Sequence, residues 1–117
     1  MDKEMITKDN LPSKCRPCEG KVAALAKEAV DKLIASYPEW QLVEDKKIAK
    51  DFRFNDFKET KKFLDRVADI AEEQGHHPTM TISYKRLKIT LTTHAASGLT
   101  ENDFIMAKLI DKAGEQE

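Results

Sequence analysis

Apolar side chains recur along the chain with two different periods, and these separate predicted helices from predicted strands. The first helical pattern covers residues 22–34 and consists of Val22, Leu25, Ala26, Ala29 and Leu33. Tyr37-Pro38 stops this pattern, because a proline cannot continue a helix. Residues 40–44 and 48–54 then flank the polar residues Glu44–Lys47, which predicts two short strands joined as a β-hairpin.

A second helix is predicted between Asn55, a suitable N-cap, and Gly75, which is placed to end the helix in a left-handed conformation. Its inward side chains should be Phe57, Phe63, Leu64, Val67, Ile70 and Ala71. After this helix the period changes to two, since Met80, Ile82 and Tyr84 alternate with polar residues, as do Leu87, Ile89 and Leu91. The alternation predicts two half-buried strands of one antiparallel pair.

The last predicted helix begins at Thr100, which Asp103 follows at the spacing of a capping box. Its apolar positions are Phe104, Ile105, Ala107, Leu109 and Ile110. The element order α-β-β-α-β-β-α predicts an α+β fold, with a four-stranded antiparallel sheet that carries three helices on one face. The other face should be rich in Thr, Ser and Lys. We divide the chain into an irregular leader, residues 1–20, and a single domain, residues 21–117.

Length and charge narrow the classes of function. The 117 residues suffice for one domain with one core. The formal net charge is −1, from 20 basic and 21 acidic residues, so binding to nucleic acid or anionic lipid is not expected. No apolar run approaches the roughly 18 residues of a membrane span, and the chain starts without the apolar core of a signal peptide. We therefore expect a cytoplasmic protein without membrane partners.

The candidate chemistry is concentrated late in the chain, where all three histidines occur. If Lys85-Arg86 forms a two-residue turn, counting across the hairpin places Ile82 opposite Ile89 and His77 opposite His94. Directly opposed residues have Cα atoms about 4.5–5.5 Å apart. Two imidazoles far apart in sequence would then meet at the open end of the hairpin.

Two carboxylates accompany the histidines. Glu72 lies four residues before His76, in the last turn of a helix, where a negative charge opposes the helix dipole. This placement hints at a function, although Glu72 could equally belong to a solvated run with Glu73 and Gln74. Asp103 could complete the helix cap and still direct one oxygen toward a site.

A zinc site is the alternative use of these histidines, and the spacing opposes it. Neither His-x-x-x-His nor His-Glu-x-x-His occurs, and adjacent histidines on an extended segment point to opposite faces. The pair Cys15-Arg-Pro-Cys18 could form half a metal site or a redox pair. It lies in a Pro-containing stretch and not where a strand enters a helix, which favours a structural or incidental role.

The spaced polar residues resemble a known signature. Glu72-x-x-x-His76-His77-Pro78, followed by Tyr84, His94 and Asp103, is similar to the motif of the pterin-4a-carbinolamine dehydratase family. The resemblance covers roughly residues 21–113 and extends to these further positions: Trp40, Phe52-x-Phe54-x-x-Phe57, Thr93, and Gly98-Leu99-Thr100. Departures are Ala95 and Ser97, where many relatives carry an acidic residue and a glycine.

The resemblance implies an activity and an assembly. It implies dehydration of 4a-hydroxytetrahydropterin to quinonoid dihydropterin, a step in recycling the tetrahydrobiopterin cofactor of aromatic amino-acid hydroxylases. It also implies a homodimer or homotetramer with sheets joined across a dimer interface. No metal or redox cofactor is expected. The family also resembles one that includes partners of a transcription factor, so a protein-interaction module, or an accessory protein for another pterin cofactor, is the alternative function.

The resemblance further implies roles for individual residues. His76, His77 and His94 match the site histidines of the family, and Glu72 and Asp103 match its supporting carboxylates. We expect His76 and His94 to act as acid and base, in an order that the sequence leaves open, and His77 to position the pterin. Glu72 would orient His76. Asp103 would hold the loop that bears His94 and cap the last helix.

Overall fold

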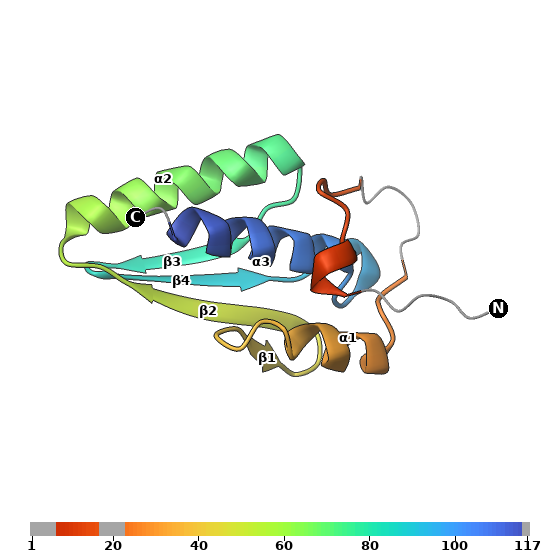
Figure 1. The fold of residues 1–117 in the computed structure, drawn as a ribbon. Coiled ribbons are helices and arrows are strands. Elements are labelled where there is room, and N and C mark those ends of the chain that lie inside the picture. Colours follow the sequence, from red (N-terminus) through yellow and green to blue (C-terminus); the bar gives the residue numbers. More distant parts are fainter. Residues whose placement is uncertain (1–6, 17–22, 116–117) are drawn as a thin grey trace.

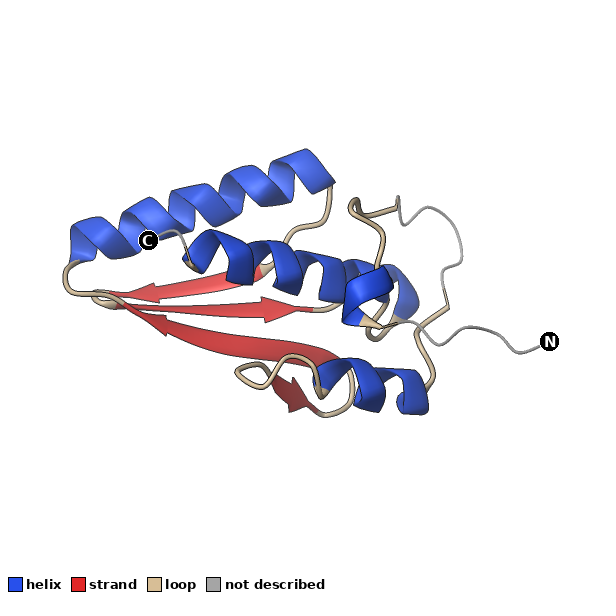
Figure 2. Ribbon diagram, in the orientation of Figure 1, coloured by secondary structure: helices blue, strands red, loops and turns tan. Residues whose placement is uncertain are grey.

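A four-stranded antiparallel sheet, covered on one face by helices, forms the core of the molecule (Figures 1 and 2). The computed structural model describes residues 7–16 and 23–115. In chain order the elements are η1 (Lys8–Asn10), α1 (Lys27–Ile34), β1 (Gln41–Val43), β2 (Lys47–Arg53), α2 (Phe57–Gln74), β3 (Thr79–Ser83), β4 (Arg86–Leu91), η2 (His94–Ala96) and α3 (Glu101–Gly114). The predicted α+β fold and element order are confirmed, with the short 3-10 helices η1 and η2 added.

The strands are ordered β1-β2-β4-β3, so the two central strands come from different hairpins. Four of their inward side chains are fully buried: Ile48, Leu87, Ile89 and Leu91. The opposite face carries Thr79, Thr81, Ser83, Lys88 and Arg86, all exposed, which agrees with the predicted polar composition. The alternation along β4 therefore separates the core from the open face.

Helices α2 and α3 lie side by side over the sheet, and α3 is the more deeply buried of the two (Figure 1). Phe104, Met106, Ala107 and Ile110 are fully buried on α3. The Tyr37 hydroxyl, also buried, donates to the Phe104 carbonyl at 2.9 Å and ties the segment after α1 to this helix. None of the described helices is both long and apolar enough to span a bilayer.

The ends of α2 follow local rules of helix capping. Asp56, and not Asn55 as predicted, is the N-cap, because its carboxylate accepts from the Glu59 amide at 2.8 Å. The predicted C-terminal glycine is confirmed, since Gly75 has φ +68°. Phe63, Val67 and Ala71 are buried as expected, whereas Phe57 is 48% exposed at the first turn of the helix. The glycine conformation turns the chain sharply just before the two adjacent histidines.

The predicted register of the second hairpin is wrong by two residues. Ser83 pairs with Arg86 and Ile82 with Leu87, so the turn residues are Tyr84 and Lys85. The predicted opposition of His77 to His94 fails with this register. Tyr84 adopts a left-handed φ of 51°, a conformation that the sequence rules reserve mainly for Gly, Asn and Asp.

The first hairpin is close to its predicted form, with Glu44–Lys46 between β1 and β2. In the second hairpin, strand β3 is at the edge of the sheet, and this changes its exposure. Ile82 pairs with the buried Leu87 and so lies on the core side of the sheet as predicted, but it is 37% exposed, and Tyr84 in the turn is 62% exposed. An edge strand has no neighbour on one side to cover its apolar residues.

The N-terminal segment, residues 7–16, packs along α3 (Figure 1). Leu11 is 8% exposed and joins the hydrophobic core, and Lys108 of α3 donates to the Lys8 carbonyl at 3.0 Å. Helix α1 starts at Lys27, later than the predicted residue 22, which lies outside the described residues together with Cys18.

We predict that Gly75→Ala lowers the free energy of unfolding by about 1 kcal/mol, because an L side chain is disfavoured at φ +68° even though no atom obstructs it. Gly114→Ala is the matched control, since its added methyl would meet Phe52 at an ordinary 3.5 Å. That variant should be neutral or slightly stabilising. Urea unfolding of both proteins measures the difference, and equal stabilities would contradict the strained-turn interpretation.

Candidate active site

Asp103 occupies the third position of α3 and is completely buried. Its Oδ2 accepts from the Thr100 amide at 3.0 Å and from the Thr93 hydroxyl at 2.8 Å. The other oxygen, Oδ1, lies 2.8 Å from His76 Nε2. One carboxylate thus caps α3, holds the residue before His94, and pairs with an imidazole.

The end of α2 places the His76 ring within hydrogen-bond distance of this carboxylate. The left-handed Gly75 ends α2, and the His76 amide turns back to donate to the Ala71 carbonyl at 3.3 Å. The His76 side chain is only 10% exposed. When the Asp103 carboxylate is ionised it only accepts hydrogen bonds, so Nε2 is then the donor in this pair and Nδ1 remains for another partner.

His77 points to a different carboxylate. Its Nε2 lies 2.7 Å from Glu72 Oε2, and both side chains are largely exposed, at 60% and 78%. Exposed polar contacts of this kind stabilise a fold weakly, whether or not the imidazole is charged. The expectation that Glu72 orients His76 is therefore wrong: Glu72 contacts His77, and Asp103 contacts His76. Adjacent residues of an extended segment point in opposite directions, and the two imidazoles accordingly contact different carboxylates.

His94 begins the short helix η2 and is exposed. Its segment is closed by Thr93 and Gly98, which form an isolated β-bridge, with the Thr93 amide 3.0 Å from the Gly98 carbonyl. Among the described residues no side chain forms a hydrogen bond with the His94 ring. The expected role of Asp103 in holding this loop agrees with its contact to Thr93.

The chain segments that carry the three histidines lie at the same end of the sheet. Thr79 at the start of β3 pairs with Thr90 near the end of β4, so the segments with His77 and His94 begin side by side although the two residues are not cross-strand partners. His76 and Thr93 contact the two oxygens of Asp103. The β3–β4 pairing and the shared carboxylate bring these segments together, without the predicted opposition of His77 and His94.

Thr93 is the site residue whose role the sequence did not reveal. Besides Asp103, its hydroxyl lies 2.8 Å from the Thr100 hydroxyl, within a fully hydrogen-bonded buried cluster. The capping-box spacing in the sequence predicted the part of this cluster that Thr100 and Asp103 form. The family resemblance includes Thr93 but assigns it no role. In the portion of the chain that the structure describes, no three His, Cys, Asp or Glu side chains are arranged to hold a metal ion.

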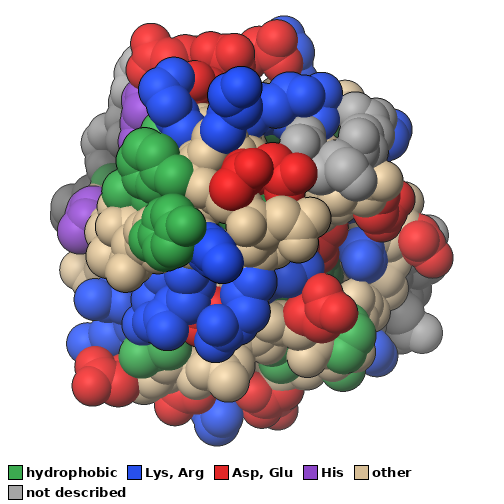
Figure 3. Space-filling view, turned by 90° about the vertical axis from the view of Figure 1, so that its left-hand side faces the viewer, with side chains coloured by type: hydrophobic (Ala, Val, Ile, Leu, Met, Phe, Trp, Pro, Cys, Tyr) green, Lys and Arg blue, Asp and Glu red, His purple; other side chains and the backbone are tan. Residues whose placement is uncertain are grey.

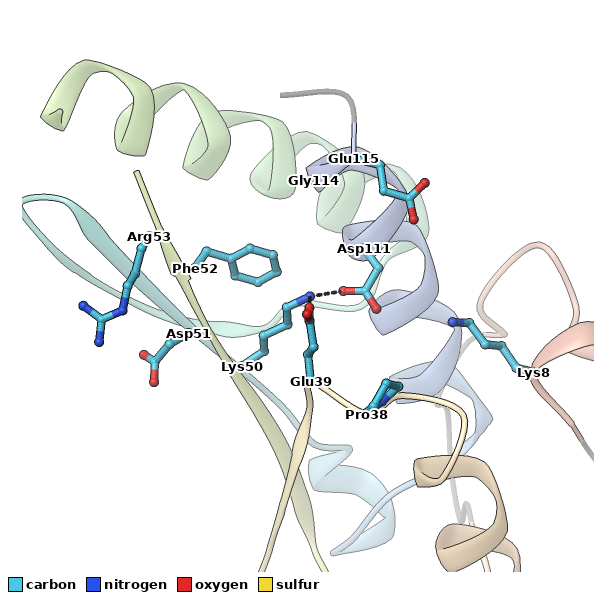
Figure 4. A pocket seen from close by; sticks show the side chains of 10 residues that line it. All are labelled: Lys8, Pro38, Glu39, Lys50, Asp51, Phe52, Arg53, Asp111, Gly114 and Glu115. Atoms are coloured by element: carbon cyan, nitrogen blue, oxygen red, sulfur yellow. Dashed lines mark hydrogen bonds and ion pairs between the residues drawn. The ribbon is translucent and has the colours of Figure 1, made fainter. Parts of the chain in front are cut away.

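A cavity of about 460 Å³ lies between β2 and the end of α3, and it contains none of these histidines (Figure 4). Lys50 crosses it, 2.8 Å from Asp111 and 2.9 Å from Glu39. Burial lowers the pKa of Lys50, but the hydrogen bonds and charges of the two carboxylates outweigh burial and raise it overall. Because the ammonium is already paired, we interpret this cluster as a structural link between β2 and α3.

Comparisons with known proteins agree with the fold and with the motif. The family model described as pterin 4 alpha carbinolamine dehydratase matches residues 23–113. A protein of Rubrobacter xylanophilus, provisionally named pterin-4-alpha-carbinolamine dehydratase, is 40% identical over 98 residues, which cover 84% of this chain and 92% of the relative. A relative with the same provisional name from Nitrosospira multiformis is 40% identical over 106 residues, covering 90% and 93% of the two chains.

Two solved structures are also similar. The first, described as a transcriptional coactivator/pterin dehydratase from Brucella melitensis, has a TM-score of 0.73 and 31% identity over 77% of this chain and 97% of that chain. The second, described as a pterin dehydratase-like protein and a RuBisCO assembly factor in the alpha-carboxysome, has a TM-score of 0.53 and 27% identity over 63% and 84%. By the extent of these matches, this chain belongs to the pterin 4 alpha carbinolamine dehydratase family.

Proposed function

We propose that this protein is a hydro-lyase that dehydrates 4a-hydroxytetrahydropterin to quinonoid dihydropterin by metal-free acid–base catalysis. The observation that carries the proposal is the pairing of His76 with a fully buried Asp103 that also holds the segment leading to His94. Membership of the family supplies the substrate class. We further propose that the protein acts in the cytoplasm, in pterin recycling for an aromatic amino-acid hydroxylase.

The reaction requires two proton transfers. The bond between C4a and the hydroxyl oxygen breaks, the proton on the neighbouring ring nitrogen leaves, and a carbon–nitrogen double bond forms as water departs. One group must protonate the leaving hydroxyl and another must accept the nitrogen proton. Free imidazoles titrate near pH 6.5, so histidines can do both near neutrality.

The contacts support different roles for the three histidines. We assign the proton transfers to His76 and His94, with Asp103 orienting His76 so that its Nδ1 is the nitrogen left to exchange a proton. The exposed His94 ring, which no described side chain binds, is available to substrate. His77, steadied by Glu72, would position the pterin.

A homo-oligomer is part of the proposal. Strand β3 is an edge of the four-stranded sheet, and Ile82 on it is more exposed than a core position would be. Edges of this kind pair readily with another chain. Joining two sheets would suit the dimer or tetramer that the family resemblance implies. Light scattering on the purified protein measures the assembly directly.

A protein-interaction module is the second candidate, because the similar structures include a coactivator and an assembly factor by their descriptions. The end of the molecule with the β3–β4 turn presents basic side chains beside apolar ones (Figure 3). Exposed residues at this end include Phe57, Ile82, Tyr84, Arg53, Lys85 and Arg86. We favour catalysis, because a scaffold would not need a histidine paired with a buried carboxylate.

We predict that His76→Ala and His94→Ala each lower the turnover rate by roughly 10- to 10⁴-fold, because each removes a general acid or base. His77→Ala should instead raise the apparent KM, since its part is to bind the pterin in ground and transition states alike. Steady-state kinetics on the three variants, with thermal melts to confirm folding, measure these effects. Folded variants with full activity would eliminate the site.

Chelation is the control for the metal-free mechanism. Dehydration by the parent protein should survive exhaustive treatment with a chelator. If activity disappeared and one added metal restored it, a metal-activated water would replace the imidazoles in the mechanism. If the untreated parent had no dehydratase activity, the interaction-module function would be favoured.

The two carboxylates should also behave differently. Asp103→Asn should reduce kcat and cost about 1–3 kcal/mol of stability, because a fully buried acceptor of several hydrogen bonds is altered. Glu72→Gln should leave stability unchanged and affect mainly the apparent KM, because Glu72 is exposed and forms a hydrogen bond with the substrate-positioning His77. Kinetics and urea unfolding of both variants test this. A larger loss of kcat in Glu72→Gln would contradict the pairing assigned above.

A further inference from the structure

The N-terminal segment, residues 7–16, ends beside the candidate active site. The Cys15 amide donates to Gln74 Oε1 at 2.8 Å, at the last residue of α2. The Arg16 amide donates to Asn102 Oδ1 at 2.9 Å, and Asn102 Nδ2 donates to the Arg16 carbonyl at 2.7 Å, near the start of α3. Two adjacent residues of this segment therefore bind two different helices.

The positions of these attachments relate directly to the site. Gln74 is two residues before His76, and Asn102 is the residue before Asp103. The His76–Asp103 hydrogen bond joins the same two chain segments. The hydrogen bonds from Gln74 through Cys15 and Arg16 to Asn102 therefore form a bridge, which is a second connection between the segments that the bond from His76 to Asp103 joins.

The bridge has the features of a fixed contact. The Asn102 amide engages both backbone groups of Arg16, as a neighbouring strand would, and Asn102 is only 5% exposed. The Cys15 thiol adds a weak contact to the Asn102 carbonyl at 3.6 Å. Arg16 itself is exposed, but the bonds are partly buried on the Asn102 side, and partly buried hydrogen bonds hold their partners more firmly than fully exposed ones do.

We propose that Gln74 and Asn102 are positioning residues of the active site, and that residues 7–16 form part of it by fixing the end of α2 relative to the start of α3. Through this bridge the segment sets the distance between His76 and Asp103. A displacement of about 1 Å between catalytic groups can cost up to about 10²-fold in rate. The effect on rate rests on the dehydratase function proposed above, whereas the effect on the His76–Asp103 bond does not.

The same segment offers a matched control. Lys108 binds the Lys8 carbonyl at 3.0 Å and so joins the segment to α3 well beyond the residues that flank the site. Lys108→Met removes this donor and keeps most of the side chain. A merely structural role for the segment predicts the same consequences whichever contact is removed.

The experiment compares Asn102→Ala, Gln74→Met and Lys108→Met in the full chain. Steady-state kinetics give kcat and KM, and NMR of protein with ¹⁵N-labelled histidine reports the His76 Nε2 proton in its hydrogen bond to Asp103. We expect Asn102→Ala and Gln74→Met to lower kcat about tenfold, to change KM by less than about twofold, and to shift or broaden this proton resonance. Lys108→Met should leave kcat and the resonance at parent values even if its melting temperature falls.

Several outcomes would overturn the proposal. One is a folded Asn102→Ala or Gln74→Met protein with the kcat and the resonance of the parent. Another is an equal loss of kcat in Lys108→Met. Gln74→Met, at a half-exposed position, keeps the test available if Asn102→Ala fails to fold. If the parent shows no dehydratase activity, the proposed function fails, and the resonance alone decides whether the bridge positions His76.

Discussion

The buried carboxylate of Asp103 is the constraint on which the arrangement of the site depends. A charge without access to water is tolerated in a protein only when hydrogen bonds and opposite partial charges compensate it. Here the Thr100 amide, the Thr93 hydroxyl and His76 supply those bonds, and the N-terminus of α3 supplies a favourable dipole. Satisfying one carboxylate therefore fixes the start of α3, the segment before His94, and the loop after α2.

This dependence explains which parts of the molecule the sequence could predict. Gly75 at the end of α2 and the capping box of Thr100 and Asp103 were predicted, because each is decided by a few neighbouring residues. The alternation in β4 was predicted for the same reason. The sheet and its helical layer then followed from the order of the elements.

Features that depend on contacts between distant residues were not predicted. The hairpin register failed because Tyr84 occupies a left-handed conformation that its residue type does not announce. Glu72 was assigned to the wrong imidazole, and the bond from His76 to Asp103 was missed, because the direction of each ring depends on how the loop after α2 packs. Likewise, no sequence pattern indicated that Cys15 and Arg16 would bind residues beside the site. In each case a tertiary contact, and not a local preference, decided the outcome.

The central claim is that Asp103 and His76 act as one unit in dehydration, and a double-mutant cycle on kcat tests it most directly. Asp103→Asn, His76→Ala and the double variant would be assayed with 4a-hydroxytetrahydropterin. If the carboxylate acts through the imidazole, the double variant should be no slower than the slower single variant. Losses of rate that simply multiply would show that the two residues act independently, and would contradict the account.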